Sequence, residues 1–320
     1  MELSRTINSD KRYYLDENTI ENAASFLQTM RVFNDAKMDL YNALYDQKYL
    51  ASGPLIDHAY PVFLKEKYKT NDYYNAAIYS AASGSLSSQK ELKKYYSTTI
   101  TADLKTRDEK IQMIQEALDK KKAVKNSIRI YRKDGRWATP YPRCQLKVKG
   151  LMIVLFNKTI VKLDEYERSV EADIRKLKTR LALVTEARNR KVKKLENIKN
   201  LPPERIVFGG KKLYSEKDTV GITKSAEDNK TSQKALKEWK QEFFEKRHQS
   251  MALPGRHTSK YGNFLCKYDG KDLSVTCIDG TTTVFHDFKL PRNEESFQKN
   301  FTCKPEERQS LCYNFILKRD

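Results

Sequence analysis

The chain has 320 residues, with 61 Lys and Arg against 42 Asp and Glu, which gives a formal net charge of +19 at pH 7. Its length suggests two domains, and the low counts of Gly (11) and Pro (9) argue against a loop-rich all-β protein and favour long helices. A compact chain with this charge repels itself unless a polyanion neutralises it. We therefore expect nucleic acid as the partner, with a membrane surface or an acidic protein as the alternatives.

Membrane-spanning and secreted classes are disfavoured by the sequence. The longest apolar run, from Leu151 to Phe156, is too short to cross a bilayer. The N-terminal segment lacks the apolar core of a secretion signal. The five cysteines form no CxxC pair, which argues against a zinc ribbon or a disulfide framework. The sequence thus predicts a cytoplasmic protein with reduced thiols and no membrane partner.

The first 125 residues are predicted to be mainly helical. Polar and apolar side chains alternate in residues 2–15, which is typical of a strand or hairpin. Apolar residues then recur at helical spacing in four segments, which we expect at Ile20 to Tyr45, at about 56–68, from Asp72 as an N-cap, and at about 86–124. We expect breaks at Gly53-Pro54 and at Gly84.

The middle of the chain changes character twice. In residues 128–160, β-branched runs with turn signals at Asp134-Gly135 and Lys149-Gly150 predict two to four short strands. Residues 161–199 form the clearest single helix, because apolar residues recur there in steps of three and four. Such a seam predicts pairing with another long helix, for which 86–124 is the natural candidate.

The last third is predicted to mix strands and helices. Pro202-Pro203 ends the long helix. The elements that we then expect are a strand at Ile206 to Tyr214, a polar loop at 215–232, a helix at 233–250, three strands joined by hairpins at Asp269-Gly270 and Asp279-Gly280, and a final strand in 311–320.

The long helix carries the densest positive charge. Residues 175–199 contain ten Lys and Arg and two Glu, and five of the bases fall within 188–194. Phosphate binding needs such a density, because each neutralised phosphate releases counterions. The same pattern also fits a solvated helix face. The net charge of the whole chain favours the binding interpretation.

No pattern of a known catalytic site accompanies this charge. His58, His248, His257 and His286 show no metal-ligand spacing, and we expect them on the surface or in loops. Asp279 follows an apolar run, as the metal-binding Asp does in RNase H-like nucleases. That chemistry needs further carboxylates on a larger sheet, so we interpret Asp279-Gly280 as a hairpin turn.

Four segments follow one another from Pro202 onward, namely PPERIVFGGKKLY, LKEWKQEFFEKRHQSM, GRHTSKYGNFLCKY and LSVTCID. In this order they resemble TnpB, or OrfB, a family of transposon-encoded RNA-guided nucleases related to compact type V CRISPR effectors. Two earlier matches, NDYYNAAIYSA and SSQKELKKYY, resemble the helical recognition region of that family. The resemblance covers nearly the whole chain but contains no catalytic motif.

The resemblance implies an α+β fold, with a helical recognition lobe of long antiparallel helices and a wedge-type antiparallel β-barrel. On that template, 1–18 is the first strand region of the barrel, and 19–199 is the recognition domain with a short strand insertion at about 128–160. Residues 200–320 continue the barrel and end before any nuclease domain. The RuvC-like domain and zinc ribbon of the family are missing from this chain. No catalytic or metal-binding residue is therefore assigned, and Mg is expected only with a RuvC-like partner.

The implied function is that of the nucleic-acid-binding half of an RNA-guided DNA effector, which holds a structured guide RNA and the RNA–DNA duplex and has no nuclease centre of its own. Whether the protein takes part in an enzyme stays open. The alternatives are a subunit of a split endonuclease completed by a separate RuvC-like chain, a coiled-coil interaction protein, and a guide-independent DNA-binding regulator.

In RNA-guided recognition, base pairing reads the sequence, while the protein contacts the nucleic-acid backbone and recognises its shape. Such contacts call for basic grooves and for aromatic side chains that stack on bases. The candidate residues for nucleic-acid binding are Arg5, Arg188, Arg190, Lys191, Lys193, Lys194, Lys211, Lys212, Trp239, Lys240, Arg247, Arg256, Lys260, Tyr261 and Asn263. Gly209-Gly210 would let a backbone approach closely. Ordinary structural roles stay open as well, with Gly209-Gly210 as a bulge, Trp239 in the core and Gly262-Asn263 as a turn.

Overall fold

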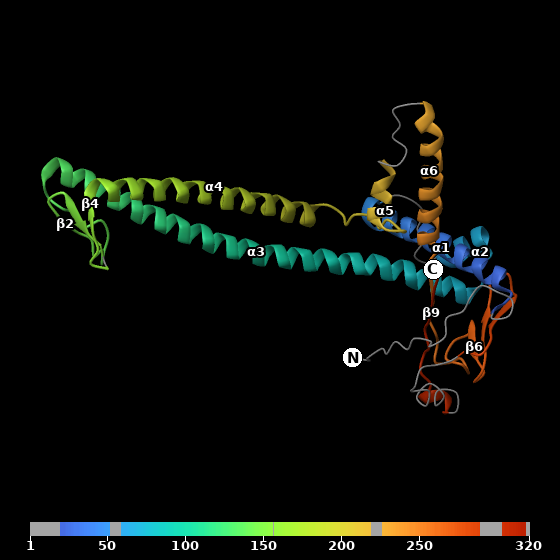
Figure 1. Cartoon of the computed structure of the whole chain (residues 1–320). Helices are drawn as coiled ribbons and strands as arrows, with labels where there is room; N and C mark the ends of the chain where they lie inside the picture. Colours follow the sequence, from blue (N-terminus) through green and yellow to red (C-terminus); the bar gives the residue numbers. More distant parts are fainter. Residues whose placement is uncertain (1–19, 52–58, 156, 219–225, 289–302, 318–320) are drawn as a thin grey trace. The chain divides into compact units, whose positions relative to one another are not determined.

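The computed structural model describes residues 20–51, 59–155, 157–218, 226–288 and 303–317 (Figure 1). The chain divides into two compact units. The first joins Met1–Gln89 to Glu204–Asp320 and is called the core unit below. The second, Lys90–Pro203, is called the hairpin unit. The predicted strand or hairpin in residues 2–15 and the break at Gly53-Pro54 lie outside the described residues.

Helix α1 (Ala23–Tyr45) is the centre of the core unit. Its buried face includes Phe26, Met30 and Phe33, which recur at helical spacing. The helix does not begin at Ile20 as predicted, because Ile20–Glu21 form strand β1 and Asn22 adopts the left-handed conformation with φ of 56°. A short α2 (Tyr60–Tyr68) follows within the predicted segment.

Two antiparallel sheets complete the core unit. The first has the order β1-β8-β7-β6 and is built from β6 (Cys266–Tyr268), β7 (Leu273–Thr276) and β8 (Thr282–Phe285) beside β1. The second pairs β5 (Ser250–Leu253) with β9 (Tyr313–Ile316). Both predicted hairpins and the last strand are confirmed. The α+β class is also confirmed, but the described strands form separate sheets and none closes into a barrel.

The first helices, together with the start of α3, belong with the C-terminal strands rather than with the hairpin unit. The Phe26 ring of α1 contacts the ring edges of Phe285 and Phe315, with centroids 5.1 and 5.0 Å apart. Strand β1 adds to β8. The compact units therefore divide at 89/90 and 203/204, whereas the sequence-based division placed all of 19–199 in one helical domain.

The predicted strand from Ile206 to Tyr214 is wrong. Gly209 and Gly210 both have positive φ angles, of 95° and 100°, which extended strands do not use. Lys211–Ser215 instead form the short helix α5, which continues into a 3-10 turn at Glu216–Asp218. A longer α6 (Ala226–Arg247) replaces part of the predicted polar loop.

Helix α3 (Asp72–Asp134) runs without a break from the core unit into the hairpin unit. The expected interruption at Gly84 is wrong, because the surrounding residues continue the helical hydrogen bonds and a single glycine costs only about 1 kcal/mol in a helix. The N-cap is Asn71 rather than Asp72, since Asn71 Oδ1 accepts the backbone amides of Tyr73 and Tyr74.

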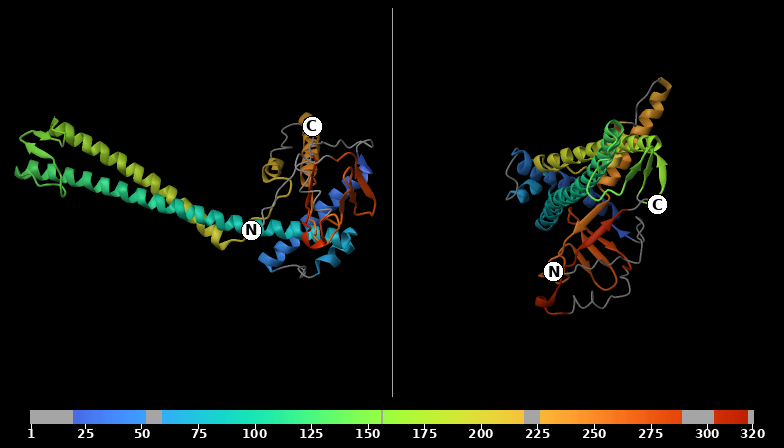
Figure 2. Two further views of the ribbon diagram at one scale, coloured as in Figure 1. Left: turned by 90° about the horizontal axis from the view of Figure 1, so that it is seen from below. Right: turned by 90° about the vertical axis from the view of Figure 1, so that its left-hand side faces the viewer.

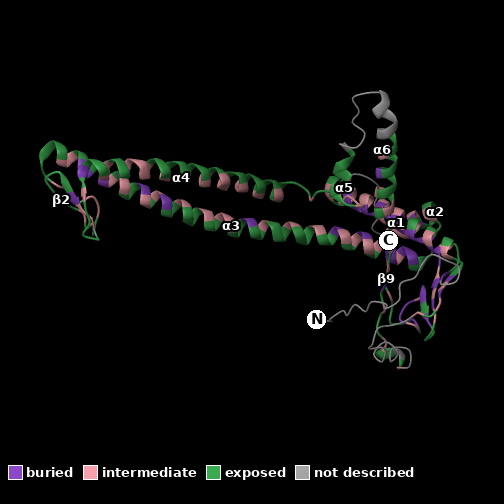
Figure 3. Cartoon of the chain, in the orientation of Figure 1, coloured by how far each residue is buried: buried purple, intermediate pink, exposed green. Residues whose placement is uncertain are grey.

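The hairpin unit consists of the later part of α3, a small sheet and α4 (Leu163–Asn200). The sheet has the order β2-β3-β4, with β2 at Lys147–Lys149, β3 at Met152–Val154 and β4 at Ile160–Lys162. Figure 2 shows α3 and α4 side by side in both views, so the predicted pairing of the two long helices is confirmed. One buried cluster lies where the sheet meets the helices, formed by Val124, Ile128, Ile153, Leu163 and Val170. Further buried residues, Ile100, Ile114 and Leu118, lie along α3 (Figure 3).

Substitution of Gly255 tests the close approach of backbone segments in the core unit. A Cβ at this position would lie 2.0 Å from the Gly262 carbonyl oxygen and 2.3 Å from that of Leu311, and backbone atoms cannot move aside cheaply. We expect Gly255→Ala to lower the free energy of unfolding by about 1–3 kcal/mol or more. Chemical denaturation measures this change.

Gly84→Ala is the matched control, because a Cβ there meets nothing within 4 Å and alanine favours the helix. It should leave stability unchanged or raise it by up to about 1 kcal/mol. Equal stability of the two variants would contradict the close approach of the chain at Gly255.

Candidate nucleic-acid interface

The positive charge of the chain is concentrated in the hairpin unit. This unit contains 30 Lys and Arg against 14 Asp and Glu, a net charge of +16, whereas the core unit, with almost twice as many residues, has a net charge of +3. Most of the excess positive charge of the chain therefore lies in the hairpin unit. A search for a polyanion site begins there.

Ion pairs between α3 and α4 use many of the acids in the hairpin unit. The pairs are Lys121–Asp173, Lys125–Glu171, Arg132 with Asp164 and Glu167, Arg188–Asp108, and Lys191–Asp103. Each such exposed pair contributes at most about 1 kcal/mol. Together they fix which residues of the antiparallel helices lie opposite one another.

The predicted cluster at 188–194 divides between two roles. Arg188 and Lys191 face α3, where the Arg188 guanidinium contacts Asp108 and Lys191 Nζ lies 3.2 Å from Asp103 Oδ2. The hydrogen bond from Arg107, followed by that from Lys191, holds the pKa of Asp103 below its ordinary value. Arg190 contacts Glu186 one turn earlier on α4 and stays largely exposed.

Lys193 and Lys194 are exposed, and no ion pair engages them among the described residues. Lys194 belongs to a longer row of bases that the sequence analysis missed. Lys176, Arg180, Arg190 and Lys194 recur at steps of 4, 10 and 4 residues, which places them on one side of a helix.

We call these four residues the α4 stripe. All four are exposed, and the row spans about 27 Å at 1.5 Å per residue. Leu183, which is 61% exposed, falls between them on the same side. The helical spacing of the bases was the signal that could have identified the stripe from the sequence.

A second concentration of bases surrounds the small sheet. Residues 120–168 contain fourteen Lys and Arg and four Asp and Glu. Ten of these bases are exposed and take part in no ion pair among the described residues, namely Lys120, Arg129, Lys133, Arg136, Arg143, Lys147, Lys149, Lys158, Lys162 and Arg168. The sequence analysis assigned no binding role to this region.

Several predicted residues of the core unit lie on its surface. Lys211 is exposed and pairs with Glu204 at 2.5 Å. Lys212 and Lys240 are exposed as well. Arg5 lies outside the described residues.

Trp239 is buried instead of being available for stacking on a base. Its side chain is 9% exposed, the indole donates to the Leu213 carbonyl at 2.7 Å, and its ring stacks on Phe243 with centroids 5.3 Å apart. The alternative interpretation of Trp239 as a core residue therefore describes its observed position. It holds α5 against α6.

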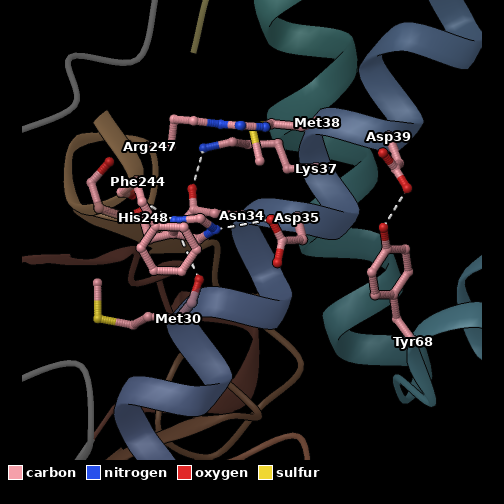
Figure 4. Close-up of polar contacts among 11 residues, drawn as sticks. Met30, Asn34, Asp35, Lys37, Met38, Asp39, Tyr68, Phe244, Arg247 and His248 are labelled. Atoms are coloured by element: carbon pink, nitrogen blue, oxygen red, sulfur yellow. Dashed lines mark hydrogen bonds and ion pairs between the residues drawn. The ribbon is translucent and has the colours of Figure 1, made fainter. Parts of the chain in front are cut away.

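Arg247 also has a partner inside the core unit. Its Nε and Nη2 lie 3.1 and 3.0 Å from the Met38 sulfur (Figure 4). Its guanidinium also lies over the Phe243 ring. Beside it, Lys37 Nζ donates to Asn34 Oδ1 at 2.6 Å, and burial lowers the pKa of the Lys37 ammonium. This group of side chains joins α6 to α1.

His248 belongs to the same group of side chains that joins α6 to α1. It is 4% exposed rather than on the surface as predicted, with Nδ1 2.7 Å from the Phe244 carbonyl oxygen and Nε2 2.9 Å from Asp35 Oδ1 (Figure 4). The adjacent Asn34 amide donates to the carbonyls of Met30 and Ser250. These polar groups therefore connect α1, α6 and β5.

The turn that contains the last predicted residues has a buried and an exposed side. Arg256 and Lys260 are exposed. Tyr261 is half-buried with the Lys260 ammonium over its ring. Asn263 is 1% exposed, and its side chain makes hydrogen bonds to four backbone groups. The polar atoms of Asn263 thus hold the turn together.

Asp279 stabilises the hairpin turn between β7 and β8. Asp279 Oδ1 accepts the hydroxyl and the amide of Thr281, which lowers the pKa of Asp279. This geometry supports the interpretation as a turn.

In the described parts of the chain, no three His, Cys, Asp or Glu side chains gather closely enough to hold a metal ion. No described helix has the length and apolar content to cross a membrane.

Comparison with protein-family models, with curated proteins and with solved structures finds no match to this chain. The functional argument therefore depends on the distribution of charge and on the contacts described above.

The roles of Asn263 and Lys260 can be separated by substitution. Asn263→Ala removes a side-chain partner from four backbone groups, so we expect the free energy of unfolding to fall by about 2 kcal/mol or more. Lys260→Ala changes an exposed cation and should alter stability by no more than about 0.5 kcal/mol. Urea denaturation measures both, and an unchanged midpoint for Asn263→Ala would contradict its structural role.

Proposed function

We propose that this protein binds nucleic acid and that the hairpin unit is its main contact with the phosphate backbone. The observation that carries the proposal is the net charge of +16 in the hairpin unit against +3 in the core unit. Such a charge on one extended pair of helices favours a polyanion, because neutralised phosphates release their counterions. Binding of this kind is independent of base sequence.

The exposed bases of the α4 stripe support this proposal more than the total charge does. Bases that face α3 have acidic partners, as Arg188 has in Asp108. Lys176, Arg180 and Lys194 take part in no ion pair among the described residues. Cations of this kind attract phosphates, whereas paired ones would have to exchange one partner for another.

The resemblance to the TnpB family narrows the proposal. On that basis the nucleic acid is a structured guide RNA with its DNA target, and the strands of the core unit belong to a wedge-type barrel. The chain would be the nucleic-acid-binding half of such an effector, and a separate RuvC-like chain with Mg would supply cleavage in a split form. A guide-independent DNA-binding regulator is the competing proposal, which predicts binding to one duplex site without RNA.

The coiled-coil alternative has a specific difficulty. It requires the seam of 161–199 to be open for a partner chain. In the hairpin unit that seam already faces α3, as the pairs Lys121–Asp173 and Arg188–Asp108 show.

The α4 stripe can be tested with the full-length protein. In a variant with Lys176, Arg180, Arg190 and Lys194 all changed to Ala, we expect the affinity for a structured RNA to fall about 10-fold or more at 0.1 M salt. The slope of log K against log salt should fall by about three to four, because four phosphate contacts are lost. Fluorescence anisotropy at several salt concentrations measures both.

The matched control removes the same charge from the core unit, with Lys217, Lys237, Lys246 and Lys267 changed to Ala, all of which are exposed. Alanine is the best helix former, so the α4 variant should keep its helicity. Equal losses in the two variants, or no binding by the unaltered protein, would contradict the proposed interface.

A further inference from the structure

The sheet in the hairpin unit has one face packed against the helices and one face open. Val148, Ile153 and Val161 lie opposite one another across the three strands and contribute to the buried cluster of the unit. Their neighbours along each strand point the other way, because side chains alternate along a strand. Those neighbours form the outer face of the sheet.

Two cross-strand rows make up this outer face. One row is Lys147, Val154 and Ile160, and the other is Lys149, Met152 and Lys162. Ile160 is 60% exposed and Met152 is 37% exposed. Lysines therefore stand on both outer strands, with apolar side chains between them.

We propose that this outer face is a second nucleic-acid-binding surface, separate from the α4 stripe. The proposal rests on the proposed function, since it assigns another part of the same hairpin unit to the same class of partner. We call Lys147, Lys149, Met152, Ile160 and Lys162 the sheet face.

The sign of the charge around the sheet face favours an anionic partner. Residues 135–163 contain six Lys and Arg and no Asp or Glu. The next acid, Asp164, contacts Arg132. No acid of this segment can therefore neutralise the lysines of the sheet face, and an anionic partner is favoured.

The positive charge extends well beyond the sheet face. The ten unpaired bases within 120–168 continue from the sheet face onto the adjoining parts of α3 and α4. A short acidic peptide would neutralise only part of such an area. A nucleic acid presents phosphates at a regular spacing over its whole length, with one per 3.4 Å on each strand of a duplex. The extent of the charge favours nucleic acid over an acidic protein.

The spacing of the lysines on the sheet face suits the two sides of a nucleic-acid groove. Neighbouring strands lie about 4.8 Å apart, so Lys149 and Lys162 are separated by about 10 Å across β3. Lysines at this separation can reach phosphates on both sides of a groove, which in the major groove of DNA is about 12 Å wide.

Leu151 lies beside the lysines in the two-residue turn between β2 and β3. Its side chain is 81% exposed, and Gly150 before it has φ of 57°. Apolar side chains between phosphate-binding cations contact sugars or bases in proteins that bind nucleic-acid grooves. The exposed position of Leu151 at the end of a lysine-rich hairpin fits this role.

The test uses the full chain with Lys147, Lys149 and Lys162 changed to Thr, which suits a strand. The probe is a fluorescent 20-base-pair duplex, measured by anisotropy between 50 and 200 mM salt. We expect about a 10-fold loss of affinity at 100 mM and a salt slope lower by about three. The control changes Lys217, Lys237 and Lys267 of the core unit to Ala and should lose less than 2-fold.

A second variant, Leu151→Ala, separates the apolar contact from charge. It should weaken duplex binding about 3-fold and leave the salt slope unchanged, because no cation is removed. Circular dichroism checks that both variants keep the helix content of the unaltered chain.

The outcomes distinguish this inference from the proposed function. If the unaltered chain binds the duplex, and the lysine variant binds it equally with the same salt slope, the inference is overturned while the proposed function stands. The sheet face would then serve another partner, such as an acidic protein. If the unaltered chain binds neither duplex nor structured RNA, both are overturned. A loss of slope in the lysine variant that the control does not share supports the inference.

Discussion

The hairpin unit has to hold two helices together although both carry an excess of the same charge. Apolar contacts near the sheet and a series of ion pairs between α3 and α4 achieve this. Six of the fourteen acids of the unit lie in these interhelical pairs. These pairs place acids between the helices, so fewer acids remain for the outward bases, of which Lys176, Arg180 and Lys194 take part in no ion pair among the described residues. The packing of the hairpin and the positive surface that we assign to nucleic acid therefore have one origin.

The core unit uses its polar side chains differently. Asn263 joins its own turn to Leu253 and Leu311 through hydrogen bonds, and His248 contacts Asp35 across α6 and α1. Trp239 and Arg247, which are typical nucleic-acid-binding residue types, lie against Phe243. The near-neutral charge of this unit agrees with that arrangement. Its contacts stabilise the fold, and acidic residues nearly balance its lysines and arginines.

Short sequence patterns were enough to predict the elements whose structure depends on residues that are close together in the chain. The apolar seam predicted α4 within one or two residues at each end, and Asp-Gly pairs predicted the hairpins between β6, β7 and β8. The failures involve contacts between distant residues. Ile20 lies in a strand because β8 is available to pair with it, and Gly209 lies so close to α6 that a Cβ there would be 2.8 Å from the Arg247 side chain and 2.9 Å from that of Phe243. Burial of Trp239 depends on Phe243 and Leu213, which only the folded chain brings together with it.

The central claim is that the hairpin unit, rather than the core unit, contacts nucleic acid. The most direct measurement is to purify the full chain at moderate salt, irradiate it with whatever nucleic acid accompanies it, and identify the cross-linked peptides by mass spectrometry. The account predicts cross-links mainly within residues 90–203, including the α4 stripe. Cross-links confined to residues 204–320, or a protein that purifies without nucleic acid and binds none when it is added, would contradict it.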